Sequence, residues 1–354
     1  MSINALSAEQ AIGRLHEFDT IIDARSENEY AEDHLPGAVN WPTLNNQERH
    51  EIGTLYKQVN PFEAKKRGAA IAARNIAAHI ERELLATPRD WAPLTYCWRG
   101  GKRSGSLSLV LDQIGFRVTI VEGGYKAFRA AVIQDLVQQV QGLDFRVICG
   151  TTGSGKTRLL HALRRAGAQV IDLEGLAKHR SSVLGAIPGL PQPSQKHFDT
   201  LIWDALRQLD RSQPVYIESE SKKVGNLAVP TPLIEAMRAS QCLNLMLPDP
   251  QRVALLLQDY EFFVRDTEYF CDRLQVLTEF RGKQMVQSWQ ASVRSGDLAS
   301  VVQELLTEHY DPVYLQSIRR NFSQFETAKT LCPEDHSVEA MDQLARAMLA
   351  TPNA

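Results

Sequence analysis

Short apolar runs alternate with longer stretches of helical spacing over the first 250 residues of the chain. In the N-terminal part this pattern predicts strands at Thr20–Asp23, Pro93–Tyr96 and Arg117–Val121, and helices at Glu27–Glu32, about 45–86, Ser104–Ile114 and Ala127–Val140. Strands that alternate with helices form parallel sheets with helices on both faces. The N-terminal part is therefore predicted to be an α/β domain.

The alternation stops at Gly142 and then restarts, so we place a domain boundary near Gln141. Four further strands are predicted at Phe145–Cys149, Gln169–Asp172, Pro214–Glu218 and Cys242–Leu247. From Gln251 onward the apolar spacing is helical almost throughout. We predict one α/β domain over 1–140, a second over 141–250, and a helical region over 251–354 packed on the second.

The overall charge is close to neutral. Lys and Arg total 39 against 42 Asp and Glu, for a net charge of −3, so any RNA contact must come from local basic patches. No apolar run approaches the ~20 residues of a membrane helix, and the N-terminus lacks the pattern of a signal peptide. These features predict a cytoplasmic protein without a membrane partner.

Cys97 stands out among five scattered cysteines because it follows a predicted strand and precedes a predicted helix. Amide groups and the dipole at a helix N-terminus favour a thiolate, and nearby cations strengthen the effect. We predict that Cys97 is a nucleophile open to solvent, with the neighbouring amides turned toward its sulfur. The predicted anion loop consists of Trp98, Arg99, Gly100, Gly101, Lys102, Arg103 and Ser104. Cys149, inside an apolar strand, is expected to be a packing residue.

A second anion loop matches the Walker A pattern between a predicted strand and a predicted helix. It consists of Gly150, Thr151, Thr152, Gly153, Ser154, Gly155, Lys156 and Thr157. Its amides and Lys156 can hold a phosphate, and Thr157 can reach magnesium. The candidates for a magnesium ligand or a supporting carboxylate are Asp172, Glu218 and Glu220. The two glutamates could instead pair with Lys222 and Lys223, and nucleotide hydrolysis stays open because the third strand does not end in Asp.

With both loops, the chain resembles the tRNA 2-selenouridine synthase family, in which a rhodanese domain is fused to a P-loop domain. The segments that carry the resemblance are Asp23–Glu27, His34–Asn40, Gly123–Arg129, Asp172–Ala177, Glu218–Ser221 and His309–Tyr314. They span nearly the whole chain. Where the family has a glycine soon after a basic pair, this chain has Ser181 and Ser182, so we transfer no site role to either.

The resemblance implies a rhodanese-like domain, a P-loop NTPase-like domain and a tRNA-modifying activity. Selenium from selenophosphate would replace the sulfur of wobble 2-thiouridine, through an S-geranylated intermediate made from geranyl diphosphate. It implies tRNA as a partner, with a selenophosphate-supplying enzyme as a further one, no tightly bound cofactor, and Mg²⁺ as a candidate ion. A diphosphate anchored by Lys156, with its prenyl tail in an apolar groove, would suit the second loop.

Five residues separate Cys97 from Arg103, as in cysteine-dependent phosphatases, and this spacing suits a tetrahedral oxyanion. We hypothesise that Cys97 attacks the selenium of selenophosphate, carries it as a selenenyl-sulfide and leaves phosphate in the loop. Trp98 would shape the uridine pocket. The alternatives are a phosphatase or sulfurtransferase fused to a kinase-like domain, and a nucleotide-gated RNA-binding module.

Several polar residues are expected to be structural. Asp23 and Arg25 form a charged pair or cap beside the first loop, and His34 is a hydrogen-bonded landmark. His309 and Tyr310 are expected to close a helix over Val301–Thr307, with Pro312 explained as a helix stop.

Overall fold

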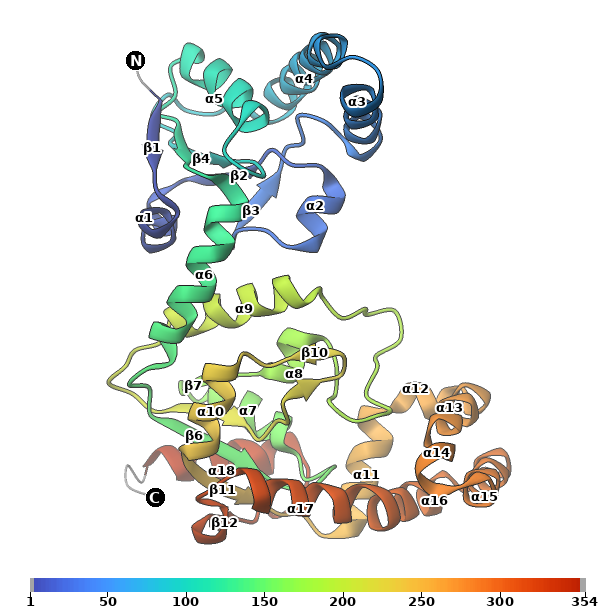
Figure 1. The fold of residues 1–354 in the computed structure, drawn as a ribbon. Helices are drawn as coiled ribbons and strands as arrows, with labels where there is room; N and C mark the ends of the chain where they lie inside the picture. The colour runs from blue at the N-terminus through green and yellow to red at the C-terminus, as the bar shows by residue number, and fades with distance from the viewer. Residues whose placement is uncertain (1–2, 351–354) are drawn as a thin grey trace. The chain divides into compact units, whose positions relative to one another are not determined.

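The computed structural model describes residues 3–350 and divides into two compact units (Figure 1). The first unit runs to Gln138 and also takes in Ser194–Asp204, and the second comprises the rest of the described chain. The division lies close to the predicted boundary at 140. The sequence pattern did not indicate that Ser194–Asp204 belongs with the first unit.

The first unit is built on a parallel five-stranded sheet with the order β1-β5-β4-β2-β3. Its strands are β1 (Asn4–Leu6), β2 (Thr20–Asp23), β3 (Ala38–Asn40), β4 (Pro93–Tyr96) and β5 (Thr119–Val121). Because the strands are parallel, their carboxyl ends lie at one edge of the sheet, and β4 delivers Cys97 to that edge. β1 is a short edge strand without a clear apolar alternation, and the sequence did not predict it.

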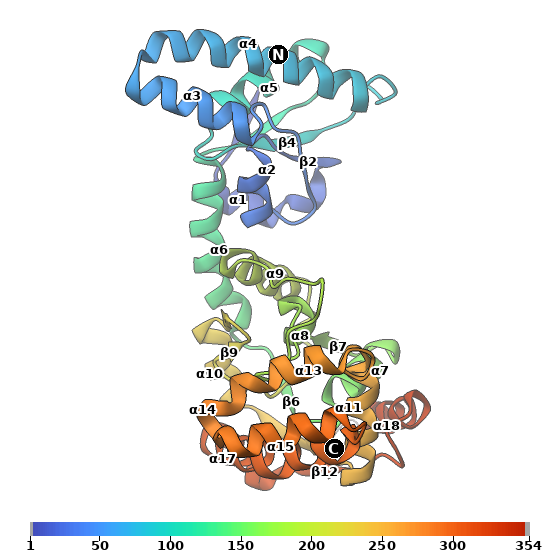
Figure 2. The same cartoon turned by 90° about the vertical axis from the view of Figure 1, so that its right-hand side faces the viewer.

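The helices of the first unit are α1 (Ala8–Gly13), η1 (Leu15–Glu17), α2 (Glu27–Glu32), α3 (Asn46–Gln58), α4 (Pro61–Glu83), α5 (Lys102–Ile114) and α6 (Gly124–Val140). The predicted helical stretch at 45–86 is an antiparallel pair, α3 and α4, that lie side by side (Figure 2). Asn45 and Asn60 cap these two helices by accepting hydrogen bonds from first-turn amides. One apolar cluster lies between the helices and the sheet and includes Ile22, Leu107 and Leu111.

The second unit contains a parallel sheet with the order β12-β11-β6-β8-β7. Its strands are β6 (Phe145–Cys149), β7 (Gln169–Ile171), β8 (Val215–Glu218), β11 (Gln241–Leu245) and β12 (Lys329–Leu331). A separate hairpin pairs β9 (Lys223–Val224) with β10 (Leu227–Ala228). β12 lies in the region predicted to be helical, so the C-terminal region contributes a strand to this sheet.

Between these strands, or directly after them in the chain, lie the helices α7 (Lys156–Arg165), α8 (Leu173–Ala177), α9 (Gln195–Arg207), α10 (Thr231–Ala239) and α11 (Asp249–Asp259). The C-terminal region adds α12 (Glu261–Arg265), α13 (Thr267–Leu274), η2 (Gln275–Leu277), α14 (Thr278–Arg281), α15 (Lys283–Arg294), α16 (Leu298–Glu304), η3 (Leu305–Tyr310), α17 (Asp311–Asn321), η4 (Phe325–Thr327) and α18 (Val338–Ala350). Met341 and Ala345 of α18 pack with Leu159 and Leu163 of α7 in one core cluster. The helical region thus shares a core with the P-loop sheet.

The predicted alternation of strands and helices is confirmed in both units, and the ends of the predicted strands are shifted by at most two residues. The predicted helix stop at Pro312 is wrong. Pro312 lies in the first turn of α17, where a missing amide hydrogen is tolerated. The six-residue π-helix η3 joins α16 to α17. Within residues 3–350, no helix combines the length and the apolar character needed to span a bilayer.

Candidate functional site

The first candidate site surrounds Cys97, between the end of β4 and the N-terminus of α5. The Gly101 amide donates to the Cys97 Sγ at 3.2 Å, and the Ser104 hydroxyl donates to it at 3.1 Å. Gly101 is the N-cap of α5, so the sulfur faces the positive end of a thirteen-residue helix. This geometry can stabilise negative charge on the sulfur, as the loop composition predicts.

The prediction that this sulfur is open to solvent is wrong. Cys97 is only 3% exposed and belongs to the apolar cluster beneath α5. The loop composition could not reveal this burial, because the covering residues come from other parts of the chain. Little of Cys97 is thus open to a reactant in this structure.

Arg103 is paired with a carboxylate of α2. Its guanidinium forms two hydrogen bonds with the Glu29 carboxylate, at 2.6 and 3.2 Å, and Arg49 contacts the same carboxylate at 3.0 Å. Glu29 therefore offsets part of the positive potential that Arg103 is expected to add near Cys97. Arg99 and Lys102 are exposed and remain available to an anion at the loop surface.

The turn after β5 holds the cysteine loop in place. The Tyr125 amide donates to the Cys97 carbonyl at 2.8 Å, and the Lys126 amide donates to the Trp98 carbonyl at 3.1 Å. A Cβ at Gly124 would lie 2.1 Å from the Cys97 carbonyl oxygen, so this close approach requires glycine. Trp98 stacks on Tyr125 with 5.5 Å between ring centroids. Trp98 thus has a partner within the protein at the place where the sequence predicted a uridine pocket.

Asp23 and Arg25 have the structural role that the sequence predicted. They form a fully buried ion pair at 2.6 Å, and Tyr96 donates its hydroxyl to Asp23 at 2.7 Å. The Arg25 guanidinium also stacks over the Tyr125 ring at 3.9 Å. His34 hydrogen-bonds the Tyr30 carbonyl at 2.9 Å. These contacts connect the ends of the strands beneath the Cys97 loop.

The second candidate site is the phosphate loop between β6 and α7. The Lys156 ammonium donates to the Gly150 carbonyl at 2.9 Å and lies 4.9 Å from the centre of the Tyr314 ring. Gly153 and Gly155 have φ values of +75° and +88°, which only glycine adopts without strain. The loop therefore has the backbone geometry that its glycines predict.

Arg252 of α11 supports this loop from outside. Its guanidinium donates to the Thr152 carbonyl at 3.0 and 2.8 Å and to the Asp311 carboxylate at 2.9 and 2.6 Å. Arg252 is 4% exposed, so these bonds form away from bulk water. The sequence pattern gave no sign of this link, since the three residues lie far apart in the chain.

Glu174, which the sequence analysis did not single out as a site residue, is the carboxylate nearest to Thr157. The Thr157 hydroxyl donates to Glu174 at 3.1 Å, and the Glu174 amide donates to Glu218 at 2.8 Å. Asp172 instead caps α8 through the Gly175 amide at 2.7 Å and accepts from His161 at 2.9 Å. The sequence offered a signal for Glu174, because it follows the end of β7 by three residues.

Glu220 is also near the loop, and it accepts a hydrogen bond from Ser181. The partners of Glu218 and Glu220 are therefore the Glu174 amide and Ser181, rather than Lys222 or Lys223. Burial, followed by the charge of Glu220, raises the pKa of Glu174 to about 8. Burial also raises the pKa values of Glu218 and Glu220. Excess negative charge at this place would be relieved by protons or by a cation.

Around the phosphate loop lies a cavity of about 680 Å³. Its lining includes Lys156, Thr157, Asp172, Glu174, Glu220 and Tyr314. Burial lowers the pKa of Lys156, but the charges of Tyr314, Glu220 and Glu174 outweigh this and leave it raised, so the ammonium stays charged. Among residues 3–350, no group of three His, Cys, Asp or Glu side chains is arranged to hold a metal ion.

The phosphate loop and the three predicted carboxylates thus lie in one unit, and the Cys97 loop lies in the other. Two family models match the chain in the same order. The rhodanese-like domain model matches residues 7–131, and the model of the tRNA 2-selenouridine synthase AAA domain matches residues 143–283.

Full-length relatives agree with both matches. The chain is 32% identical over 334 residues to a tRNA 2-selenouridine synthase from Sulfurovum sp. (strain NBC37-1), a match that covers 86% of this chain and 90% of that protein. It is 31% identical over 323 residues to a tRNA 2-selenouridine synthase from Marinobacter nauticus, with 83% and 87% covered. The chain therefore belongs to the tRNA 2-selenouridine synthase family and is an enzyme of that family.

Proposed function

We propose that this enzyme replaces the sulfur of wobble 2-thiouridine in tRNA with selenium from selenophosphate, through an S-geranylated intermediate made from geranyl diphosphate. The observation that carries the proposal is the presence, in one family member, of a complete phosphate loop with a large cavity and of a cysteine whose sulfur faces a helix N-terminus. The phosphate loop would serve prenylation, and the Cys97 loop would serve selenium transfer.

In the prenylation step, the thiouridine sulfur attacks C1 of geranyl diphosphate, and the C–O bond to diphosphate breaks. Diphosphate leaves with the electron pair, and Lys156 with the loop amides holds its charge. The uridine N3 proton is lost as the S-prenyl bond forms. Solvent accepts this proton.

Magnesium would assist the same step by neutralising the diphosphate. It prefers oxygen ligands. The Thr157 hydroxyl and the Glu174 carboxylate lie 3.1 Å apart, and one Glu218 oxygen is buried without a partner, so these residues fit such an ion. Of the carboxylates that the sequence offers for magnesium, Glu218 would remain beside the ion, and Glu174 would join it.

In the selenium step, attack of Cys97 on selenium does not balance in electrons. Attack of a thiolate on selenium would expel phosphorus with the electron pair, as phosphite rather than phosphate, unless an oxidant were present. Attack of the Cys97 thiolate on phosphorus is balanced, because the P–Se bond breaks and selenide leaves with the pair. Selenide then adds to C2 of the S-geranyl uridine and displaces geranyl thiolate, while water releases phosphate from Cys97. The phosphatase-like spacing of the loop suits a phosphoryl group better than a selenenyl-sulfide.

The test is mass spectrometry of thiouridine-containing tRNA incubated with the protein, geranyl diphosphate and selenophosphate. We expect Cys97→Ala to accumulate S-geranyl tRNA and Lys156→Ala to leave thiouridine unmodified. Matched controls are Cys332→Ala and Lys222→Ala, both at exposed positions. Normal selenation by Cys97→Ala would contradict the role of Cys97, and normal prenylation by Lys156→Ala would contradict the role of the phosphate loop.

Three further expectations belong to this proposal. A selenophosphate-supplying enzyme would act as a partner, and the cytoplasm would be the place where tRNA and both co-substrates meet. Affinity for tRNA should fall steeply as salt rises, because phosphate contacts release counterions.

A further inference from the structure

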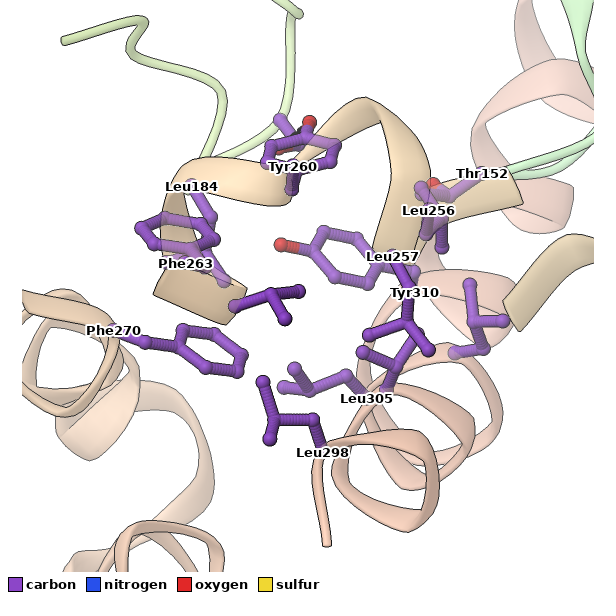
Figure 3. Close-up of a pocket in the computed structure, with 14 residues that line it drawn as sticks. Thr152, Leu184, Leu256, Leu257, Tyr260, Phe263, Phe270, Leu298, Leu305 and Tyr310 are labelled. Carbon is purple, nitrogen blue, oxygen red and sulfur yellow. Dashed lines mark hydrogen bonds between the residues drawn. The ribbon is translucent and has the colours of Figure 1, made fainter. Parts of the chain in front are cut away.

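A small apolar chamber adjoins the cavity of the phosphate loop in the second unit (Figure 3). Its volume is about 50 Å³. Six of its lining residues are the apolar side chains of Leu257, Phe263, Phe270, Leu298, Leu305 and Leu306. They come from α11, α12, α13, α16 and η3, and those labelled in Figure 3 surround one space.

The chamber and the larger cavity share part of their walls. The shared residues are Thr152, Ser182, Leu256, Tyr260 and Tyr310. Thr152 belongs to the phosphate loop itself. A ligand bound at the loop therefore has the chamber beside it.

The chamber differs from the cavity in charge. Among the described residues that line the chamber none is charged, whereas Lys156, Glu174 and Glu220 line the cavity. A group that enters the chamber must be apolar, since an unpaired charge there would lose its hydration without compensation. The two spaces together suit a molecule with an anionic end and an apolar end.

The backbone between the two spaces is held by specific contacts. Leu256 packs against Gly153 so closely that a Cβ at Gly153 would lie 3.0 Å from the Leu256 Cδ1. One turn earlier on α11, Arg252 holds the Thr152 carbonyl and Asp311. Asp311 directly follows η3, so the same ion pair connects the phosphate loop to the helix that lines the chamber.

The π-helix η3 determines which side chains reach the two spaces. Leu305, Leu306 and Tyr310 line the chamber, while His309 lines the larger cavity. The wider turn of a π-helix shifts the side chains from the direction that a continuous α-helix would give, and such turns often occur at functional sites. The expectation that His309 and Tyr310 merely end a helix does not account for their place in these walls.

We infer that the chamber receives the far end of the isoprenoid chain of an allylic diphosphate, and that its walls limit the length of the chain that the enzyme uses. The inference rests on the proposed function. A volume of about 50 Å³ is a few times the ~10–15 Å³ that one water needs, so the chamber has room for a slender chain end and little more.

The test measures S-prenylation of thiouridine tRNA with the five-, ten- and fifteen-carbon diphosphates (dimethylallyl, geranyl and farnesyl). Leu305→Ala enlarges the chamber, and we expect it to raise the kcat/KM ratio of farnesyl to geranyl diphosphate by at least about tenfold. Val302→Phe fills the chamber, and we expect it to lower kcat/KM for geranyl diphosphate by about tenfold or more and to spare the dimethylallyl compound. Val338→Phe, at an exposed position outside the chamber, is the matched control.

Binding of inorganic diphosphate, which has no chain, shows that each variant keeps its phosphate loop. If Leu305→Ala does not fold, Leu298→Ala enlarges the same chamber at a less buried position. Unchanged chain preference in variants that bind diphosphate normally would overturn the inference, while the proposed function would stand. If the unaltered protein prenylates tRNA from none of the three diphosphates, the proposed function itself is wrong.

Discussion

Ser181 adopts a backbone conformation that glycine prefers, with φ at +57°. It occupies the short segment where the family resemblance led us to expect a glycine. Its hydroxyl donates to Glu220, and this bond offsets part of the cost of the left-handed conformation. A residue next to the cavity thus combines local strain with a contact to one of the buried carboxylates.

Ser181→Gly should therefore be tolerated better than Ser181→Ala. Glycine removes the strain when it removes the hydroxyl, and we expect a change in the free energy of unfolding below about 1 kcal/mol. Alanine keeps the strain and removes the hydroxyl that donates to Glu220, at a cost of about 1–2 kcal/mol. Denaturant unfolding of both variants tests this, and equal stability of the two would contradict the role given to the left-handed conformation.

Two cysteines of very different exposure, Cys97 and Cys332, give a second prediction at this scale. Cys332 is exposed, whereas Cys97 is 3% exposed. We expect iodoacetamide to modify Cys332 at least about tenfold faster than Cys97 in the free protein, because access limits reaction of a buried thiol. Peptide mass spectrometry measures both rates in one sample. Faster labelling of Cys97 would show that its loop opens readily in solution.

At the scale of elements, the ends of β7 and β8 bring acidic side chains beside the phosphate loop. Glu174 follows β7, and Glu218 ends β8. Lys156 faces them from α7, with Glu220 and Asp172 nearby. The parallel order of the sheet predicts that strand ends meet, but the pairing of Thr157 with Glu174 depends on where α8 begins.

This cluster should make the protein less stable as pH rises. Burial, then Glu220, raises the pKa of Glu174 from 4.5 to about 8, so between these values the folded state binds more protons than the unfolded state. Stability then falls as pH rises through this window, by an amount on the order of a few kcal/mol. Glu174→Gln should flatten the slope measured by denaturant unfolding, while the exposed Glu235→Gln should keep it.

Arg252 gives another prediction for the link between α11, the phosphate loop and α17. Arg252→Met removes the bonds to Thr152 and leaves the Asp311 carboxylate without its partner. We expect a loss of about 2–4 kcal/mol in stability and weaker binding of inorganic diphosphate. Calorimetric titration measures the binding. Arg265→Met, which breaks only an exposed ion pair, should change neither quantity.

At the scale of the whole molecule, the first unit is completed by a segment from the middle of the chain. Ser194–Asp204 belongs to this unit, and Trp203 packs edge to face against Phe128 with 5.9 Å between ring centroids. Thr200 and Tyr125 both donate to the buried Asp33. The first unit therefore depends on residues that lie beyond the phosphate loop in the sequence.

Trp203→Ala should lower the free energy of unfolding of the first unit by about 3–5 kcal/mol, because it empties a fully buried site. Phe62→Ala, at a position that is 65% exposed in the same unit, should stay within about 0.5 kcal/mol. Hydrogen exchange of the full chain, read on peptides of β2 and β4, measures both effects. Unchanged exchange in Trp203→Ala would show that Ser194–Asp204 is not part of the unit in solution.

The sequence by itself determined the features that consecutive residues encode. The alternation of strands and helices, the turn after Cys97 and the glycine-rich phosphate loop each occupy one short stretch, so their local spacing was enough to predict them. The resemblance to one family could be seen for the same reason, because its motifs are short and lie in order along the chain.

Only the tertiary structure decided which distant residues meet. Segments far apart in the sequence meet where Cys97 is buried, where Arg103 pairs with Glu29, where Glu174 lies beside Thr157, and around the apolar chamber. Hydrophobic periodicity shows that a face is buried but not what covers it. The covering partner depends on packing of the whole unit, and that packing exists only once the chain has folded.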